Sequence, residues 1–313
     1  MKTKIITLIV VLSVYVSFGQ NFIEKEIHIP SNKVAINGTL LSSDNMGQTP
    51  LVIIITGSGA NNRDGNQVGL KANSLKYLAE GLANQQIASY RYDKSAITLL
   101  KKNDFKEKDI TFDDFIDDAI AVIDYFIGKE QFSKIIFVGH SQGSLVGMIA
   151  SRLRADGFIS IAGAGRPINE ILLEQLLLQA PAWKDDISKT LDSLKNGKID
   201  KNFNPLLASI FRTSVQPFLI SWMQYNPQDE IRKLEIPILI VNGTKDIQVP
   251  VSDGELLHKA TQKSEFQVIE NMNHIFKKVK GDKSENLATY NNNEQPIMKE
   301  LVIVISKFVS QIK

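Results

Sequence analysis

Short apolar segments alternate with longer amphipathic segments along most of the chain. Almost every position in the apolar segments is hydrophobic, which predicts strands covered on both faces, as in a parallel sheet. These predicted strands span residues 51–55, 87–92, 134–138, 158–162, 236–241 and 266–269. Two earlier segments, residues 22–29 and 34–41, are expected to form an opening hairpin, with Ser31-Asn32 and Asn37-Gly38 as turn residues.

The amphipathic segments between the strands carry helix signals. In residues 112–127 apolar side chains recur every three or four positions, Thr111 precedes them as a cap, and Gly128 follows them. Ser252 and Glu255 have the spacing of a capping box before another apolar helix face. Strands that alternate with helices in this way predict an α/β fold with a mostly parallel central sheet flanked by helices.

One long segment interrupts the alternation. About seventy residues separate the strand that ends near Ala164 from the strand that opens at Ile236, and they contain helical patterns without a strand pattern. Such a length exceeds a plain connection and predicts a helical lid, residues about 166–235, inserted after the sixth strand. Some of its large apolar side chains are expected to build the lid's own core and others to face a bound ligand; they include Trp183, Phe211, Phe218, Trp222 and Met223.

The N-terminus has the pattern of a secretory signal peptide. Two lysines precede an apolar run from Ile5 to Phe18, and the small residue Gly19 marks the expected cleavage point. The alternative, a retained membrane anchor, is disfavoured because the run is shorter than the ~20 residues that cross a bilayer. We therefore expect residues 1–19 to be a signal peptide, residues 20–313 to be one domain, and the protein to be exported to the periplasm or the medium.

Composition narrows the classes of function. The chain has 313 residues, 43% of them hydrophobic and 22% charged, as in an ordinary globular protein. It has no cysteine, which excludes a lipid-modified cysteine, disulfides and thiol chemistry. The formal net charge of +2 falls to zero when residues 1–19, with their two lysines, are removed. Nothing in this balance predicts binding to nucleic acid or to anionic membranes.

A candidate nucleophile follows the predicted strand at residues 134–138. The sequence there is Gly139-His140-Ser141-Gln142-Gly143, and a helical pattern begins directly after it. G-x-S-x-G between a strand and a helix is typical of a serine held on a sharp turn, where only glycine-sized neighbours leave room. The helix that follows directs its positive end at the same place and favours an oxyanion there. This context identifies Ser141 as the expected nucleophile.

A serine hydroxyl needs a base, and the base needs an acid to orient it. His274 follows the last predicted strand, whereas the other three histidines lie in a strand, in a helix or beside the serine. Asp246 follows the strand at residues 236–241, with Asp253 as the nearest competitor. Both positions fall at the carboxyl edge of the sheet, where Ser141 is also expected. The resulting chain order, serine, acid, histidine, is the one expected of α/β-hydrolases.

Two backbone N–H groups are candidates for an oxyanion hole. Gln142 directly follows the nucleophile, and Ser58 lies in the glycine-rich sequence Thr56-Gly57-Ser58-Gly59 after a predicted strand. The alternative interpretation of this loop, a phosphate-binding turn, lacks the following lysine and hydroxyl residue. None of these roles requires a metal ion or an organic cofactor.

These motifs, together with Tyr90-Arg91-Tyr92-Asp93 and Asn273-His274-Ile275-Phe276, resemble the α/β-hydrolase superfamily, and within it the esterase and serine aminopeptidase-like branch. The resemblance covers nearly all of residues 20–313 and implies the α/β-hydrolase fold. In similar proteins the Arg-Tyr-Asp segment is usually followed by an arginine and glycine turn, whereas Lys94-Ser95-Ala96-Ile97 follows here. Thr56-Gly57 likewise replaces a His-Gly pair that is usual in the family.

Three functions fit these residues. The first is a carboxylesterase that acts on a small-molecule ester through an acyl-serine. The second is an aminopeptidase or amidase, in which Glu170 and Glu174, one helical turn apart in the lid, would bind the ammonium group of the substrate; their alternative is an ordinary solvated helix face. The third is a catalytically silent binding protein that keeps the fold. Candidates for every catalytic role favour an enzyme, and we expect the carboxylesterase.

Overall fold

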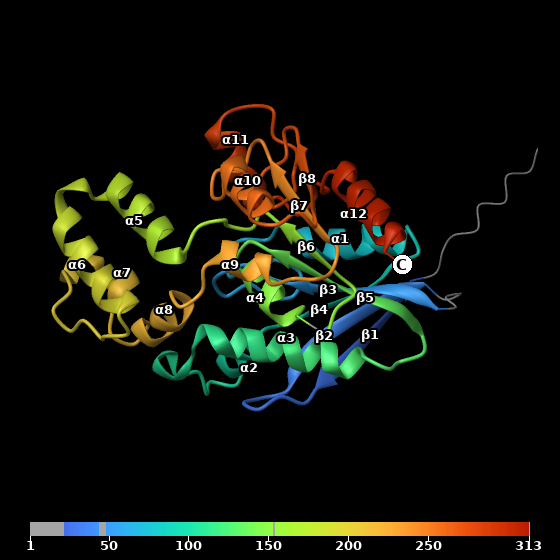
Figure 1. Ribbon diagram of the computed structural model, residues 1–313, viewed down its shortest axis with the longest axis horizontal. Coiled ribbons are helices and arrows are strands. Elements are labelled where there is room, and N and C mark those ends of the chain that lie inside the picture. The colour runs from blue at the N-terminus through green and yellow to red at the C-terminus, as the bar shows by residue number, and fades with distance from the viewer. Residues whose placement is uncertain (1–21, 44–47, 153, 313) are drawn as a thin grey trace, which may run out of the picture.

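A single sheet of eight strands forms the centre of the described protein (Figure 1). The computed structural model describes residues 22–43, 48–152 and 154–312, so the predicted signal peptide lies outside the described residues. The strands are β1 (Phe22–Ile29), β2 (Ile36–Ser43), β3 (Thr49–Ile55), β4 (Ala88–Tyr92), β5 (Phe132–His140), β6 (Gly157–Ile161), β7 (Ile238–Gly243) and β8 (Ser264–Ile269). Their order is β1-β2-β4-β3-β5-β6-β7-β8; β2 pairs antiparallel with β1 and with β4, and the other pairs are parallel.

Helices cover both faces of the sheet because the inner strands are apolar on both faces. In β3, Val52 and Ile54 pack in one core with α1 and α12, whereas Ile53 and Ile55 pack in the other with α3 and α4. All four side chains are at most 1% exposed, and burial of such a side chain contributes about 1.5–3 kcal/mol. The helices concerned are α1 (Ser74–Ala83), α3 (Phe112–Phe126), α4 (Gln142–Ala150) and α12 (Lys299–Gln311).

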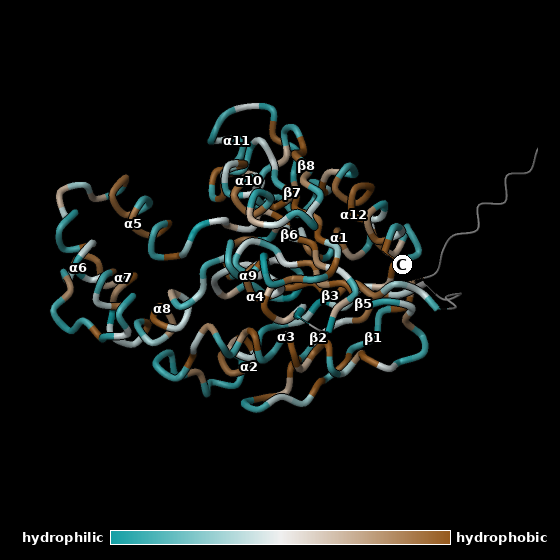
Figure 2. The backbone as a smooth tube through the Cα atoms, in the orientation of Figure 1, coloured by the Kyte–Doolittle hydropathy of each residue, from teal (hydrophilic) through white to brown (hydrophobic). Residues whose placement is uncertain are grey.

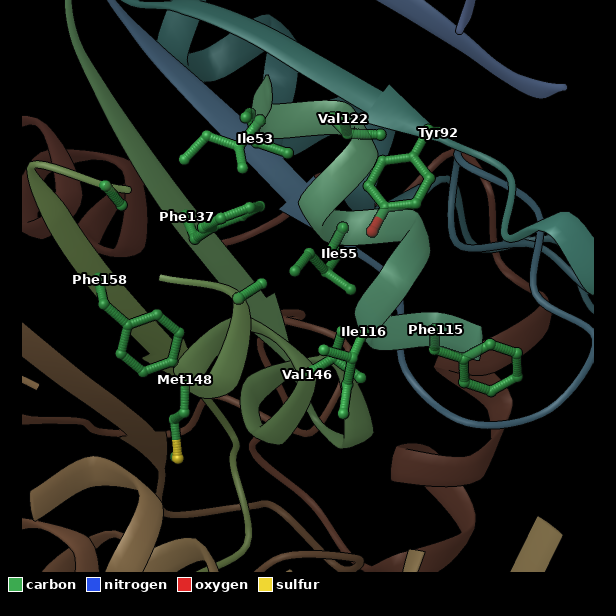
Figure 3. Close-up of a cluster of buried hydrophobic side chains, with 14 of the residues drawn as sticks. Ile53, Ile55, Tyr92, Phe115, Ile116, Val122, Phe137, Val146, Met148 and Phe158 are labelled. Atoms are coloured by element: carbon green, nitrogen blue, oxygen red, sulfur yellow. The ribbon is translucent and has the colours of Figure 1, made fainter. Parts of the chain in front are cut away.

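The core on the α3 and α4 side is drawn in Figure 3, where Ile53, Ile55 and Phe137 from the strands face Ile116 and Val146 from the helices. Figure 2 shows hydrophobic segments gathered on the central strands and the helices beside them. Helix α3 begins as predicted: Thr111 and Asp114 form a capping box, in which the Asp114 carboxylate accepts the Thr111 N–H at 2.7 Å.

The segment between β6 and β7 is a helical insertion, residues 162–237. Its helices are α5 (Ile168–Gln179), α6 (Lys184–Lys195), α7 (Ala208–Phe211), α8 (Gln216–Trp222) and α9 (Pro227–Arg232). Helices α5 to α8 extend to one side of the sheet (Figure 1) and bury a core of their own that contains Ile187, Leu194 and Phe211. Helix α8 joins this body to α3, since the Trp222 ring stacks on the Phe112 ring at 5.4 Å. The insertion therefore occupies the place predicted for the lid.

The remaining elements are α2 (Ser95–Lys101), α10 (Val251–Ala260), α11 (Lys283–Ala288) and the 3₁₀ helices η1 (Glu107–Asp109), η2 (Pro181–Trp183), η3 (Pro205–Leu207) and η4 (Thr289–Asn291). Among the helices of the described residues, none has both the length and the apolar character that a membrane span requires.

Two local predictions were wrong. Asn37 and Gly38 lie inside β2, where a Cβ on Gly38 would fall 2.2 Å from the Tyr90 ring, so the glycine admits that ring and forms no turn. Helix α10 begins at Val251 after Pro250, so Ser252 is already helical and caps nothing.

Candidate active site

Ser141 occupies a strained turn between β5 and α4. Its φ of 54° and ψ of −120° lie in a region that L-residues rarely adopt. Its N–H donates to the Ile161 carbonyl at 2.9 Å, which ties the turn to β6. The strand on one side and the helix on the other thus hold the serine in this conformation at the carboxyl edge of the sheet.

The two glycines of the motif permit the turn because the backbone passes very close to them. A Cβ on Gly139 would lie 2.3 Å from the Gly143 carbonyl oxygen, and a Cβ on Gly143 would lie 2.5 Å from the Ile55 carbonyl oxygen. Real Cβ atoms do not approach a backbone oxygen so closely. The G-x-S-x-G pattern is therefore a steric requirement of packing α4 against β3 and β5.

Asp246 and His274 are joined directly. Asp246 Oδ2 lies 2.8 Å from His274 Nδ1, and both side chains are almost completely buried. The other carboxylate oxygen of Asp246 accepts the backbone N–H groups of Gln248 at 2.8 Å and Val249 at 2.9 Å. Because a carboxylate only accepts, Nδ1 of His274 carries the proton and Nε2 is left with a free lone pair.

Ser141 and His274 face the same cavity, here called the polar pocket. It has a volume of about 100 Å³ and is also lined by Ser58 and by the polar side chains of Asn61, Gln67, Gln248 and Tyr290. Within the described residues the Ser141 hydroxyl makes no hydrogen bond to the imidazole. Such bonds are often long before substrate binds and tighten only in the complex. The structure therefore places Ser141, the candidate nucleophile, and His274, the candidate base, in the lining of one small cavity.

A second cavity, the insertion pocket, also opens at Ser141. It has a volume of about 240 Å³, and the insertion lines it with the apolar Ile168, Ile171, Leu172 and Trp222 and with Arg166 and Gln175. Ser58 and Gln142 line it as well. The structure thus brings the insertion to the serine, and two pockets meet at Ser141, with Ser58 and Gln248 also lining both.

The oxyanion-hole candidates lie against the nucleophile. Gln142 is the first residue of α4, where a backbone N–H has no acceptor inside the helix. The loop that carries Ser58 touches the serine turn, since a Cβ on Gly57 would be 3.2 Å from the Ser141 Cβ. The loop that carries Ser58 and the first turn of α4 therefore both lie beside the serine, where an oxyanion hole is expected.

Two residues of the site had no role in the sequence analysis. His140 Nε2–H donates to the His274 carbonyl at 2.9 Å, and burial lowers the pKa of His140 to about 3, so it stays neutral and holds the His274 backbone. Lys94 is buried behind the oxyanion loop and donates to the Gly57 carbonyl at 2.8 Å. The only sequence signal for Lys94 was its place in the departure from the family pattern.

Glu170 and Glu174 are not brought into the site. Both are exposed on α5, and neither lines the polar pocket or the insertion pocket. Glu174 forms an ion pair with Arg166, which Asp253 also binds at 3.0 Å. The residues of α5 that line the insertion pocket are instead uncharged: Ile168, Ile171, Leu172 and Gln175.

Asp253, the competitor of Asp246, lies elsewhere. It accepts the Gly165 N–H at 2.9 Å and the Arg166 guanidinium, and so anchors the start of the insertion.

In the part of the chain that the structure describes, no group of three or more histidine, aspartate or glutamate side chains is arranged to hold a metal ion.

Comparisons with curated proteins identify relatives of known name. Esterase EstD from Thermotoga maritima is 28% identical over 265 residues, which cover 82% of this chain and 60% of that protein. Karrikin insensitive 2 receptor CA from Petunia hybrida is 25% identical over 181 residues, or 49% of this chain and 62% of the receptor. The chain thus spans about 60% of the length of these curated relatives.

Solved structures share the fold. Est1E from Butyrivibrio proteoclasticus has a TM-score of 0.58 at 18% identity, with 91% of this chain and 99% of that chain covered. Dienelactone hydrolase from Anabaena variabilis has a TM-score of 0.54 at 13% identity, with 93% and 98% covered. These likenesses, with the sheet order above, show an α/β-hydrolase fold, as expected from the sequence.

A family model described as serine aminopeptidase, S33, matches residues 68–277, a stretch that includes Ser141, Asp246 and His274. The chain therefore belongs to the serine aminopeptidase S33 family of α/β hydrolases.

Proposed function

We propose that the protein is a serine hydrolase that cleaves carboxylic esters through an acyl-serine intermediate. The observation that carries the proposal is the 2.8 Å bond between buried Asp246 and His274, whose imidazole shares the polar pocket with Ser141 on its strained turn. A serine, a base and a carboxylate that orients the base form the arrangement that activates a hydroxyl for acyl transfer. The relative from Thermotoga maritima, named an esterase, supports the same reaction.

The first half-reaction follows from the roles of these residues. The Ser141 oxygen attacks the ester carbonyl carbon while His274 Nε2 takes the hydroxyl proton, and the carbonyl becomes a tetrahedral oxyanion. The N–H groups of Ser58 and Gln142 donate to that oxyanion. The C–O bond to the alcohol then breaks, and the imidazolium returns its proton to the departing oxygen. The products are the free alcohol and an ester of Ser141.

The second half-reaction releases the acid. Water gives a proton to His274 and adds to the acyl-serine carbonyl through the same oxyanion hole. The bond to the Ser141 oxygen then breaks, and His274 returns the proton to that oxygen. The Asp246 carboxylate stays ionised and stabilises the imidazolium in both halves.

The two pockets suggest how an ester lies across Ser141. The insertion pocket, about 240 Å³, suits the acyl chain, because its lining includes the large apolar side chains of Ile168, Ile171, Leu172 and Trp222. The polar pocket, about 100 Å³ and adjacent to His274, suits a small alcohol group and the water that follows it. This assignment places the leaving oxygen next to the imidazole that protonates it.

The alternative function, an aminopeptidase or amidase that trims amino-terminal residues, is less well supported. An enzyme of that kind must pair the substrate's ammonium with a carboxylate. No aspartate or glutamate of the described residues lines either pocket beside Ser141, and Arg166 lines one of them. The charge around the serine therefore favours a neutral ester over a peptide with a free amino terminus.

The experiment compares the wild type with Ser141→Ala on p-nitrophenyl acetate, butyrate and octanoate and on aminoacyl p-nitroanilides. We expect ester turnover in the wild type and a loss of at least about a thousandfold in Ser141→Ala. Ser151→Ala is the matched control, because that hydroxyl only bonds the Gly147 carbonyl in α4. Faster turnover of the anilides would overturn the ester assignment, and a wild type that no fluorophosphonate probe labels would indicate a binding protein.

Export is a separate proposal that rests on residues 1–19 alone. Mass spectrometry of the protein secreted or held in the periplasm should find an N-terminus close to Gln20. An intact Met1 on the mature protein would contradict it.

A further inference from the structure

Lys94 is a buried cation directly behind the oxyanion loop. It follows β4 and Asp93 and precedes α2, and it is 3% exposed. Its Nζ donates to the Gly57 carbonyl at 2.8 Å and lies 3.4 Å from Oε1 of Gln142. Its third neighbour is the Phe115 ring, whose centroid is 4.5 Å away. One ammonium group thus contacts both segments that carry the proposed oxyanion donors.

The contact with Gly57 bears directly on Ser58. The Gly57 carbonyl and the Ser58 N–H belong to one peptide group, and in a planar trans peptide they point in opposite directions. Holding that carbonyl toward Lys94 therefore directs the Ser58 N–H away from Lys94. Ser58 lines both pockets that open at Ser141, so this is the orientation that a donor to the oxyanion needs.

We propose that Lys94 is a positioning residue of the oxyanion hole: its ammonium fixes and polarises the Gly57–Ser58 peptide and holds the Gln142 side chain beside it. The inference rests on the proposed acyl-transfer function. A charge on the carbonyl oxygen draws electron density from the peptide and strengthens its N–H as a donor. A neutral side chain of similar length would hold the loop less firmly and would not polarise it.

The surroundings of Lys94 make the positive charge of its side chain unfavourable for folding. In the described part of the chain, no carboxylate forms an ion pair with its Nζ. Burial lowers the pKa of Lys94 to about 8, and Asp118 from α3, the charged group that faces it, opposes this only in part. The Asp118 carboxylate is itself engaged by the Ser95 N–H at 2.7 Å. A buried cation without an ion-pair partner costs folding free energy, and groups perturbed in this way cluster at functional sites.

Direct contact with substrate is excluded by position. Lys94 lines neither the polar pocket nor the insertion pocket, so it reaches the reaction only through the Gly57–Ser58 peptide and Gln142. Its removal should therefore weaken the transition state and leave the binding of the ground state nearly unchanged.

The test compares wild type, Lys94→Met, Lys94→Arg and the control Lys101→Met, whose lysine is exposed and bonds Asp93. With p-nitrophenyl butyrate we expect kcat of Lys94→Met to fall about tenfold to a hundredfold, with KM within about twofold of wild type. Phenylboronic acid, which forms a tetrahedral adduct with a serine hydroxyl, should bind more weakly by a similar factor, whereas butyrate should inhibit as before. Lys94→Arg keeps the cation and should recover part of both losses.

Each other result contradicts the inference. Unchanged kcat and boronate affinity in a folded Lys94→Met would show that the ammonium is dispensable. Equal losses in boronate and butyrate binding, or no recovery in Lys94→Arg, would indicate general damage to the pocket. A wild type that binds no boronate and turns over no ester would overturn the proposed function together with this inference, so the two failures are distinguishable. Thermal unfolding of each variant confirms that folded proteins are compared.

Discussion

Asp246 and His274, 28 positions apart in the chain, meet through a 2.8 Å bond between Oδ2 and Nδ1. The bond exists because β7 and β8 are parallel neighbours, which places the loops after them at the same edge of the sheet. The aspartate is fixed in turn by two backbone N–H groups of its own loop. The carboxylate therefore has a defined orientation before any substrate arrives.

Asp246→Asn should abolish most of the activity while the protein stays folded. The asparagine can still accept the Gln248 and Val249 N–H groups, but its NH₂ would face Nδ1 and force the proton of His274 onto Nε2. We expect kcat to fall about 10³- to 10⁴-fold with little change in KM. Asp156→Asn is the control, because Asp156 accepts the Ile135 N–H near the start of β5, whereas Ser141 follows the end of that strand. A similar loss in both variants would refute a special role for Asp246.

Gly57→Ala should lower the activity, whereas Gly143→Ala should lower the stability of the folded protein. A Cβ on Gly57 would meet the Ser141 Cβ at 3.2 Å and His140 Nδ1 at 3.4 Å, contacts that side chains relieve by small shifts. We expect a folded protein whose kcat is lower by about tenfold. A Cβ on Gly143 would meet backbone oxygens of Ile55 and Thr56 at 2.5 and 2.6 Å, so this variant should lose stability. Thermal unfolding and ester kinetics of both variants test this difference. Equal unfolding temperatures of Gly57→Ala and Gly143→Ala would contradict the prediction.

His140 should make the protein sensitive to acid. Burial lowers its pKa from 6.5 to about 3, so the folded state favours the neutral ring. Above pH 6.5 the ring is neutral in both states and has no effect, whereas between pH 6.5 and 3 only the unfolded state gains the proton, so stability falls by up to about 1.4 kcal/mol per pH unit. His140→Gln keeps an N–H donor for the His274 carbonyl but does not titrate. Between pH 7 and about 4 the wild-type unfolding temperature should fall more steeply than that of the variant; parallel slopes would show that His140 does not cause the loss.

Trp222 should set the length of the acyl chain. It lies between the insertion pocket and a further apolar cavity of about 400 Å³ that contains Phe105, Phe115 and Phe218. Trp222→Ala should join the two cavities and shift the preference among p-nitrophenyl esters from butyrate toward octanoate by about tenfold. Trp183→Ala is the matched control, because Trp183 packs in the insertion's own core and lines neither cavity. An unchanged chain-length profile in Trp222→Ala would place the acyl group elsewhere.

Features that depend on neighbouring residues were predictable from the sequence. The central strands are continuous runs of buried apolar side chains, and the predicted segments match β3 to β8 to within a few residues at each end. The serine turn was also predictable, because G-x-S-x-G between a strand and a helix is a local sequence signal, although the contact that requires glycine at 143 is made with the distant strand β3. Predictions failed where a residue with a local turn signal packs against a residue distant in sequence. Gly38 looks like a turn residue but makes room for the Tyr90 ring.

The amino-acid sequence by itself determined the order of strands and helices, the strained turn at Ser141 and the candidates that could serve it, because these follow from periodicity and local sterics. Only the tertiary structure decided which candidates meet. It placed Asp246 rather than Asp253 beside His274, turned Glu170 and Glu174 toward solvent, and buried Lys94 against the oxyanion loop. These outcomes depend on which strands become neighbours and which face of a helix packs inward, and those are set by burial across the whole fold.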